Sequence, residues 1–191
     1  MIYHSIGEIF DGIDETRGRL VNRVAGLSRA QENFRPAADA WTIAEIVEHV
    51  SIIEGQLVRL TALLLKQAEA SSGAPARVGV ESGEAAPIVD LRAILERAAK
   101  EKYQSPEMAR PRGDATVADS LAKLRETRAS ILALRPRFEA ADLSQVKYPH
   151  PVFGPLDLYQ WLAFIGIHED RHLRQIERLM SAPEFAGAAT A

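Results

Sequence analysis

The C-terminal stretch Pro155–Met180 constrains the fold most, because its apolar residues and two histidines recur at helical spacing. Side chains three or four residues apart lie on one face of an α-helix, which has 3.6 residues per turn. We therefore predict a helix that buries this face. The opposite face is charged and is interpreted as a solvated strip, in which Asp170 stands four residues before Arg174 as in a helical ion pair. The predicted buried face consists of Leu158, Leu162, Ile165, His168, His172, Ile176 and Leu179.

His168 and His172 are unusual members of an apolar face. A single histidine there is more often a core residue with a satisfied hydrogen bond than a metal ligand. Two of them each need a buried partner, since an unpaired buried polar group costs about 1–3 kcal/mol. One divalent metal satisfies both, because side chains at i and i+4 lie about 6 Å apart and an imidazole nitrogen binds zinc at about 2 Å. Such a site needs a third ligand from another segment.

His49 is the candidate for that third ligand. Thr42 and Glu45 form a capping-box pattern that begins a second helix, predicted to run to about Ala70. His49 stands on the apolar stripe of this helix, so it points inward. Glu45, four residues earlier, is either the capping residue alone or also a partner that orients the imidazole. We predict that His49 converges with the two histidines of the last helix to bind one metal ion.

Two other histidines are weaker candidates. His150 lies in the segment 142–155, which three prolines and a glycine predict to be ordered but not helical. It is either an exposed loop residue or a fourth ligand or proton carrier near the site. His4 is the weaker of the two.

Three more helices account for the rest of the predicted core. The first spans about residues 3–26, and Arg17 on it is interpreted as a side chain whose charged end reaches solvent. A shorter helix spans Val89–Tyr103, and another begins at the N-cap Thr116 and ends before Pro136. The connecting and terminal segments are 27–40, 71–87 and a tail, predicted to be disordered, at 183–191.

Composition limits the class of protein. A chain of 191 residues is predicted to form a single domain, residues 1–191. With a net charge of -3 and no long basic cluster, neither nucleic acid nor a membrane surface is an expected partner. Cysteine is absent, so any metal must take nitrogen and oxygen ligands. The first residues lack the pattern of a signal peptide and no apolar run approaches the length of a membrane span, so we expect a cytoplasmic protein.

The sequence His168-Glu169-Asp170-Arg171-His172 also matches H-E-x-x-H, the pattern of zinc proteases. In that alternative Glu169 is the general base and a third ligand follows downstream. Only nineteen residues follow His172, which leaves little chain to supply that ligand. The protease is therefore the less favoured hypothesis.

Three short motifs together resemble the DinB/YfiT-like superfamily. They are Trp41–His49, the lead Pro151–Pro155, and His168–Ile176. The resemblance spans most of the chain and implies an all-α fold, a four-helix bundle with an additional short helix, often dimeric. It also implies that three histidines, here His49, His168 and His172, bind a divalent metal with positions left open.

The resemblance also suggests an activity. Characterised relatives include thiol-dependent S-transferases and a mycothiol-dependent maleylpyruvate isomerase. We expect a divalent-metal-dependent enzyme that uses zinc, nickel or iron and acts on a small molecule. Its reaction is expected to be that of a small-thiol-dependent S-transferase or of a related transferase or hydrolase. We also expect a homodimer. Since the chain has no cysteine, the thiol would arrive as a small molecule. The alternative is a non-catalytic helical protein that binds metal for stability or sensing, or that holds a small ligand.

Overall fold

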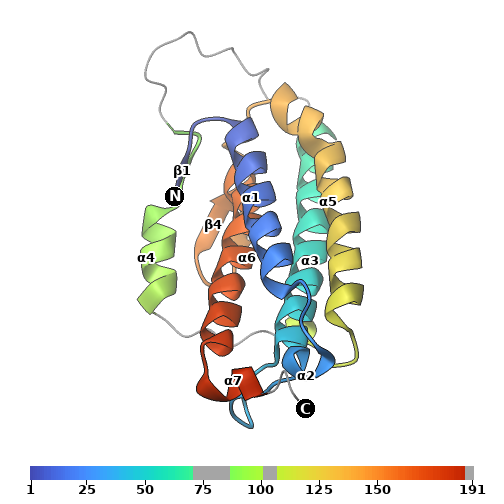
Figure 1. The fold of residues 1–191 in the computed structure, drawn as a ribbon. Coiled ribbons are helices and arrows are strands. Elements are labelled where there is room, and N and C mark those ends of the chain that lie inside the picture. The colour runs from blue at the N-terminus through green and yellow to red at the C-terminus, as the bar shows by residue number, and fades with distance from the viewer. Residues whose placement is uncertain (71–86, 101–106, 188–191) are drawn as a thin grey trace.

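Four long helices form a bundle in the computed structural model, which describes residues 1–70, 87–100 and 107–187 (Figure 1). Helix α6 packs against α1 and α3, and α3 in turn packs against α5. The predicted four-helix bundle is confirmed. No helix in these ranges is both long and apolar enough to cross a bilayer. The four helices are α1 (Ile6–Val24), α3 (Ile43–Ala70), α5 (Val117–Ala140) and α6 (Leu158–Met180).

Besides the four long helices, the structure contains short helices and short strands. The sequence analysis did not predict the strands. Both strand pairs are antiparallel: β1 pairs with β2, and β3 pairs with β4 in a hairpin that leads into α6. The strands are β1 (Ile2–Tyr3), β2 (Val89–Asp90), β3 (Lys147–His150) and β4 (Gly154–Asp157). The short helices are α2 (Arg29–Glu32), α4 (Arg92–Lys100), the 3-10 turn η1 (Glu107–Ala109) and α7 (Pro183–Gly187).

Side-chain caps fix where the long helices begin. The Thr42 hydroxyl accepts a bond from the Glu45 N–H at 3.1 Å, and the Glu45 carboxylate accepts one from the Thr42 N–H at 2.7 Å. Thr116 caps α5 and Asp157 caps α6 in the same reciprocal way. Each box satisfies amide groups that have no partner inside the helix. The predicted N-caps Thr42 and Thr116 are confirmed.

A layer of buried polar residues separates two apolar clusters in the bundle core. One cluster lies toward the hairpin and includes Phe10, Leu65 and Leu162. The other lies toward the start of α3 and includes Leu20 and Ile46. Across the described residues, inside and outside this layer, the buried polar side chains are Thr16, Thr42, Glu48, His49, Ser51, Glu54, Thr61, Ser120, Arg128, Glu169, Asp170 and His172.

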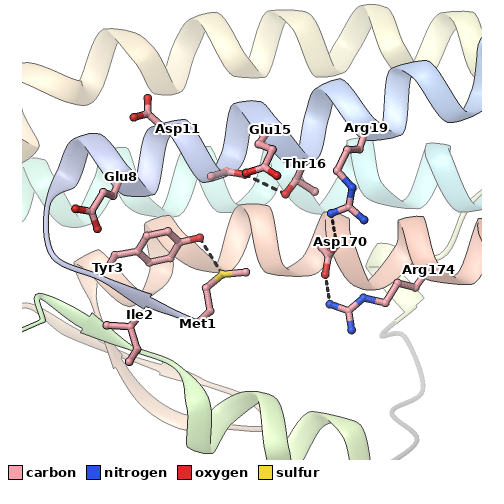
Figure 2. Close-up of a pocket in the computed structure, with 11 residues that line it drawn as sticks. Met1, Ile2, Tyr3, Glu8, Asp11, Glu15, Thr16, Arg19, Asp170 and Arg174 are labelled. Atoms are coloured by element: carbon pink, nitrogen blue, oxygen red, sulfur yellow. Dashed lines mark hydrogen bonds and ion pairs between the residues drawn. The ribbon is translucent and has the colours of Figure 1, made fainter.

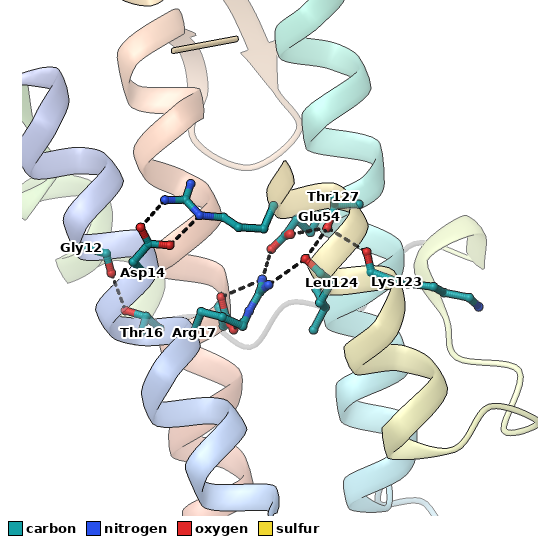
Figure 3. Close-up of polar contacts among 10 residues, drawn as sticks. Gly12, Asp14, Thr16, Arg17, Glu54, Lys123, Leu124 and Thr127 are labelled. Carbon is teal, nitrogen blue, oxygen red and sulfur yellow. Dashed lines mark hydrogen bonds and ion pairs between the residues drawn. The ribbon is translucent and has the colours of Figure 1, made fainter. Parts of the chain in front are cut away.

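Arg17 connects all four long helices within this layer (Figure 3). Its guanidinium donates to Glu169 of α6 at 2.7 Å and to the Leu124 carbonyl of α5 at 2.9 Å, and it pairs with Glu54 of α3. The interpretation of Arg17 as a solvent-reaching side chain was wrong, since only 12% of it is exposed. Helical spacing shows that a residue lies near a stripe, but not that two carboxylates of other helices face it.

Three predicted boundaries were also wrong. The helix predicted from Val89 begins at Arg92, because Val89 and Asp90 pair with β1 and the Asp90 carboxylate accepts a bond from the Arg92 N–H at 3.0 Å. Its predicted end, Tyr103, lies outside the described residues. Helix α5 continues through Pro136 to Ala140. Residues 183–187, assigned to a disordered tail, form α7, and the remaining residues of that tail lie outside the described ranges.

Tertiary contacts explain why α5 passes Pro136. A proline removes one backbone hydrogen bond and disfavours the helix interior. Beyond it, Phe138 is fully buried and its ring packs 6.5 Å from that of Tyr159, while Arg137 binds Glu69 of α3 through two bonds of 2.7 and 2.8 Å. These contacts hold the last turn of the helix in place.

The strip predicted to be solvated on α6 is partly buried. Asp170 is 7% exposed and binds Arg19 of α1 at 3.0 Å as well as its predicted partner Arg174 (Figure 2). Both arginines line a shallow cavity of about 700 Å³ against β1 and α1. The predicted ion pair of Asp170 with Arg174 is therefore confirmed. The prediction that Asp170 is exposed to solvent was wrong, because α1 covers this side of α6.

We expect Arg17→Met to destabilise the protein by about 3–5 kcal/mol, because it leaves Glu54 and Glu169 buried without a cation. Chemical denaturation measures the free energy of unfolding. Arg137→Met, which breaks an exposed pair, should cost far less. Adding Glu54→Gln and Glu169→Gln to Arg17→Met should recover much of the loss. A loss in Arg17→Met no greater than in Arg137→Met would contradict this role.

Candidate metal centre

Three histidines from two helices meet at one point of the polar layer. His49 comes from α3, and His168 and His172 come from successive turns of α6. Nitrogen atoms of the three rings all lie within 4.8 Å of one another, and Nε2 of His49 lies 3.2 Å from Nε2 of His168. Ring centroids are 4.5–5.1 Å apart. The structure thus brings together the three residues predicted as ligands.

Hydrogen bonds at the outer edges of two rings set their tautomers. Nδ1 of His49 lies 2.6 Å from the Ala109 carbonyl, and Nδ1 of His172 lies 2.9 Å from Oε1 of Gln175. A carbonyl oxygen only accepts, so each Nδ1 carries the hydrogen and donates it. The lone pair that a metal needs therefore lies on Nε2 of His49 and of His172. Outer partners of this kind are typical of metal-binding histidines.

The spacing of the rings suits a small divalent ion. Two nitrogens that bind one tetrahedral zinc ion at about 2.0–2.1 Å lie about 3.4 Å apart. The observed 3.2 Å between Nε2 of His49 and Nε2 of His168 is close to that separation. Three neutral imidazoles also form a donor set that zinc, nickel and iron accept. The residues present therefore fit a metal.

The surroundings keep the imidazoles neutral. Burial is the main cause that lowers the pKa of all three histidines: that of His49 is lowered, that of His168 lies well below its ordinary value, and that of His172 is lowered to about 3. Repulsion between adjacent positive charges of neighbouring histidines is part of the shifts of His168 and His172. Only a neutral imidazole has a lone pair for a metal. The cluster is thus in its binding form at neutral pH.

Sequence reasoning missed the support around His49. Buried Glu48 accepts bonds from the backbone N–H groups of Arg112 at 3.1 Å and Gly113 at 3.0 Å. This anchors the loop that carries Ala109, whose carbonyl orients His49. Gly113 has φ = +78°, a conformation that favours glycine. Proline and glycine, here Pro111 and Gly113, disfavour a helix, but no local pattern shows which residue holds the loop.

Neither candidate carboxylate joins the histidine cluster. Glu45 caps α3 and pairs with Arg35 at 2.7 Å, so only the capping alternative is supported. Glu169 faces away and is bound by Arg17. Burial raises the pKa of Glu169 to about 7, and the bond from Arg17 opposes this shift. The third histidine, His49, comes from upstream of the H-E-x-x-H match, whereas the protease alternative needs a ligand downstream. The position of Glu169 and the position of His49 both count against the zinc protease.

The histidine cluster opens onto a cavity of about 1350 Å³ between α3, α6 and the β3–β4 hairpin. Trp41 packs beside the cluster, with its ring 4.9 Å from that of His49. Phe164 lies 6.1 Å from His168 and extends an aromatic wall toward the hairpin. The wall is completed by Tyr148, Phe153 and Trp161. The cavity is large enough for a small organic molecule.

His150 belongs to this wall and not to the histidine cluster. It is half-buried, stacks 4.6 Å from Phe153 and lies 4.9 Å from Phe164. Its Nδ1 accepts backbone N–H groups of Val152 and Phe153 at 3.1 and 3.3 Å, and burial lowers its pKa to about 4. It is a neutral side chain that lines the cavity, so the alternative of an exposed loop residue was wrong.

A helical bundle with a three-histidine cluster between two of its helices is the class of protein that this fold and site define. The family model of the DinB superfamily matches residues 13–176, and the chain belongs to that superfamily. The Uncharacterized protein YuaE of Bacillus subtilis (strain 168) is 28% identical over 174 residues, covering 91% of this chain and 98% of that protein. The fold is also similar to TT2238, described as a four-helix bundle protein, with a TM-score of 0.58, 18% identity, and coverage of 91% and 98% of the two chains.

We expect His49→Ala to abolish tight metal binding and to leave the helices in place, since the apolar clusters do not depend on the imidazole. Metal analysis by mass spectrometry and circular dichroism measure the two effects. His150→Ala, which alters the same cavity outside the cluster, is the matched control and should retain metal. Full occupancy in His49→Ala would show that His49 is not a ligand.

Proposed function

We propose that this protein is a divalent-metal-dependent enzyme whose ion is held by His49, His168 and His172. The observation that carries the proposal is the position of the three imidazoles at the wall of a large cavity. Structural zinc sites are closed by four protein ligands, whereas catalytic sites have three and keep one position for water or substrate. Three ligands beside a cavity are the catalytic arrangement.

A divalent ion at this site supplies Lewis acidity that lowers the pKa of a bound water or thiol to near neutral. The protein's own residues orient the imidazoles and limit the access of water to them. Ala109 and Gln175 keep the Nδ1 atoms of His49 and His172 protonated, so that both Nε2 lone pairs face the centre. Trp41 and Phe164 place apolar rings against the cluster and limit the access of water.

The reaction proposed is transfer to or from a small thiol, with a related transfer or hydrolysis as the next candidate. The chain has no cysteine to act as nucleophile, so a thiol must enter the cavity as a cosubstrate. Membership of the DinB superfamily and the resemblance to thiol-dependent S-transferases support this choice. Zinc, nickel and iron all suit a three-imidazole site.

A non-catalytic metal protein is the second candidate, and one observation favours it. The histidines come from α3 and α6, so an ion between them would cross-link two helices of the bundle. A ligand that binds only the folded state stabilises it. A structural cross-link does not require a cavity beside the histidine cluster. We therefore prefer the hypothesis of an enzyme to that of a non-catalytic metal protein.

Metal-dependent turnover is the expected result when the purified protein is given a small thiol and an electrophilic acceptor. Chelation should abolish the activity, and zinc, nickel or iron should restore it, because the thiol needs the ion to ionise near neutral pH. Loss of free thiol measures turnover, and His49→Ala is the control. If a panel of thiols gave no metal-dependent turnover while chelation lowered the melting temperature strongly, the structural-metal candidate would replace the enzyme.

A further inference from the structure

The cavity has two chemically different ends. Helix α6 runs along the cavity. Because a helix rises about 1.5 Å per residue, the positions of residues on α6 give distances along the cavity. Trp161 and Phe164, before the histidines, belong to the aromatic wall formed with the hairpin. Arg171 lies between the two histidines of α6 and Arg178 lies six residues beyond His172, and both line the cavity. The histidine cluster therefore lies between the aromatic wall and Arg178, with Arg171 beside it.

The charges that line the cavity are unbalanced. Three arginines and one aspartate, Asp39, line it among the described residues, whereas the whole chain has a net charge of -3. The positive excess is therefore a local property of this cavity. A concave, largely apolar site with charges of one sign concentrates the electrostatic field and attracts ligands of the opposite sign.

Arg171 and Arg178 are placed to act together. They are seven residues apart, which is two helical turns, so both project from the same face of α6. Both side chains are exposed, and Arg178 lies six residues beyond His172, about 9 Å along the helix axis. Arginine presents several donors in a planar fork that matches a carboxylate. An anionic group bound there lies at one end of a molecule that also reaches the histidines.

We propose that the cavity binds an elongated organic anion, with an apolar ring against the aromatic wall and a carboxylate at Arg171 and Arg178. The atom that reacts then lies beside the histidine cluster. This assignment rests on the proposed function and adds the class of substrate to it. Aromatic rings recognise the apolar part by contact area and ring stacking, and the arginines recognise the charge.

Two matched probes test the assignment: phenylpentanoate and phenylpentanol, which share a carbon skeleton and differ in the terminal group. Their affinities are compared by calorimetry with zinc-loaded protein and again after chelation. We expect the carboxylate to bind at least tenfold more tightly than the alcohol in both states. In Arg171→Gln/Arg178→Gln the two affinities should become similar. Arg174→Gln removes an arginine of the same helix that lines the other cavity, against β1 and α1, so it is the matched control and should keep the difference.

Equal binding of the two probes to the unaltered protein would overturn the assignment. So would a difference that disappears on chelation, because the metal and not the arginines would then recognise the carboxylate. Arg59 of α3 is the third arginine that lines the cavity. Loss of the difference in Arg59→Gln but not in the double variant would place the anion at Arg59 and would also overturn the assignment. Metal content is measured separately, so a protein that binds no metal refutes the proposed function and leaves the probe comparison readable in the metal-free state.

Discussion

The bond between one guanidinium and two carboxylates in the middle of the bundle is the interaction on which the rest of the structure depends. Arg17 of α1 holds Glu54 of α3 and Glu169 of α6 together, and it also binds the backbone of α5 at Leu124. Burial raises the pKa of Glu169, and the nearby carboxylate of Glu54 adds to the shift, while Arg17 opposes it. Buried charges tolerate little displacement, because each lost contact leaves a charge without a partner.

This constraint fixes the register of α3 against α6, and the histidine cluster depends on that register. Glu169 is the neighbour of His168, and Glu54 lies five residues after His49 on α3. When Arg17 aligns the two carboxylates on one side of the helices, the histidines meet on the other. The loop held by Glu48 then completes the alignment, since it delivers the Ala109 carbonyl to Nδ1 of His49.

Residues of α6 line two different cavities. Asp170 and Arg174 line the shallow cavity against α1, and His168, His172 and two arginines line the large cavity. The β3–β4 hairpin covers one end of that cavity with Tyr148, His150 and Phe153. The bundle therefore supplies a rigid cluster, and the hairpin and the loop before α3 supply its chemical surroundings.

The sequence by itself determined the long helices, two of their N-caps and the inward direction of three histidines. These follow from periodicity and from local hydrogen bonds, which act within one or two helical turns. Only the tertiary structure decided that Arg17 is buried, that α5 passes Pro136, that Val89 joins a strand, and that Glu48 anchors the loop beside His49. Each of these depends on a contact between residues distant in sequence, whose energy outweighs the local preference and leaves no trace in helical spacing.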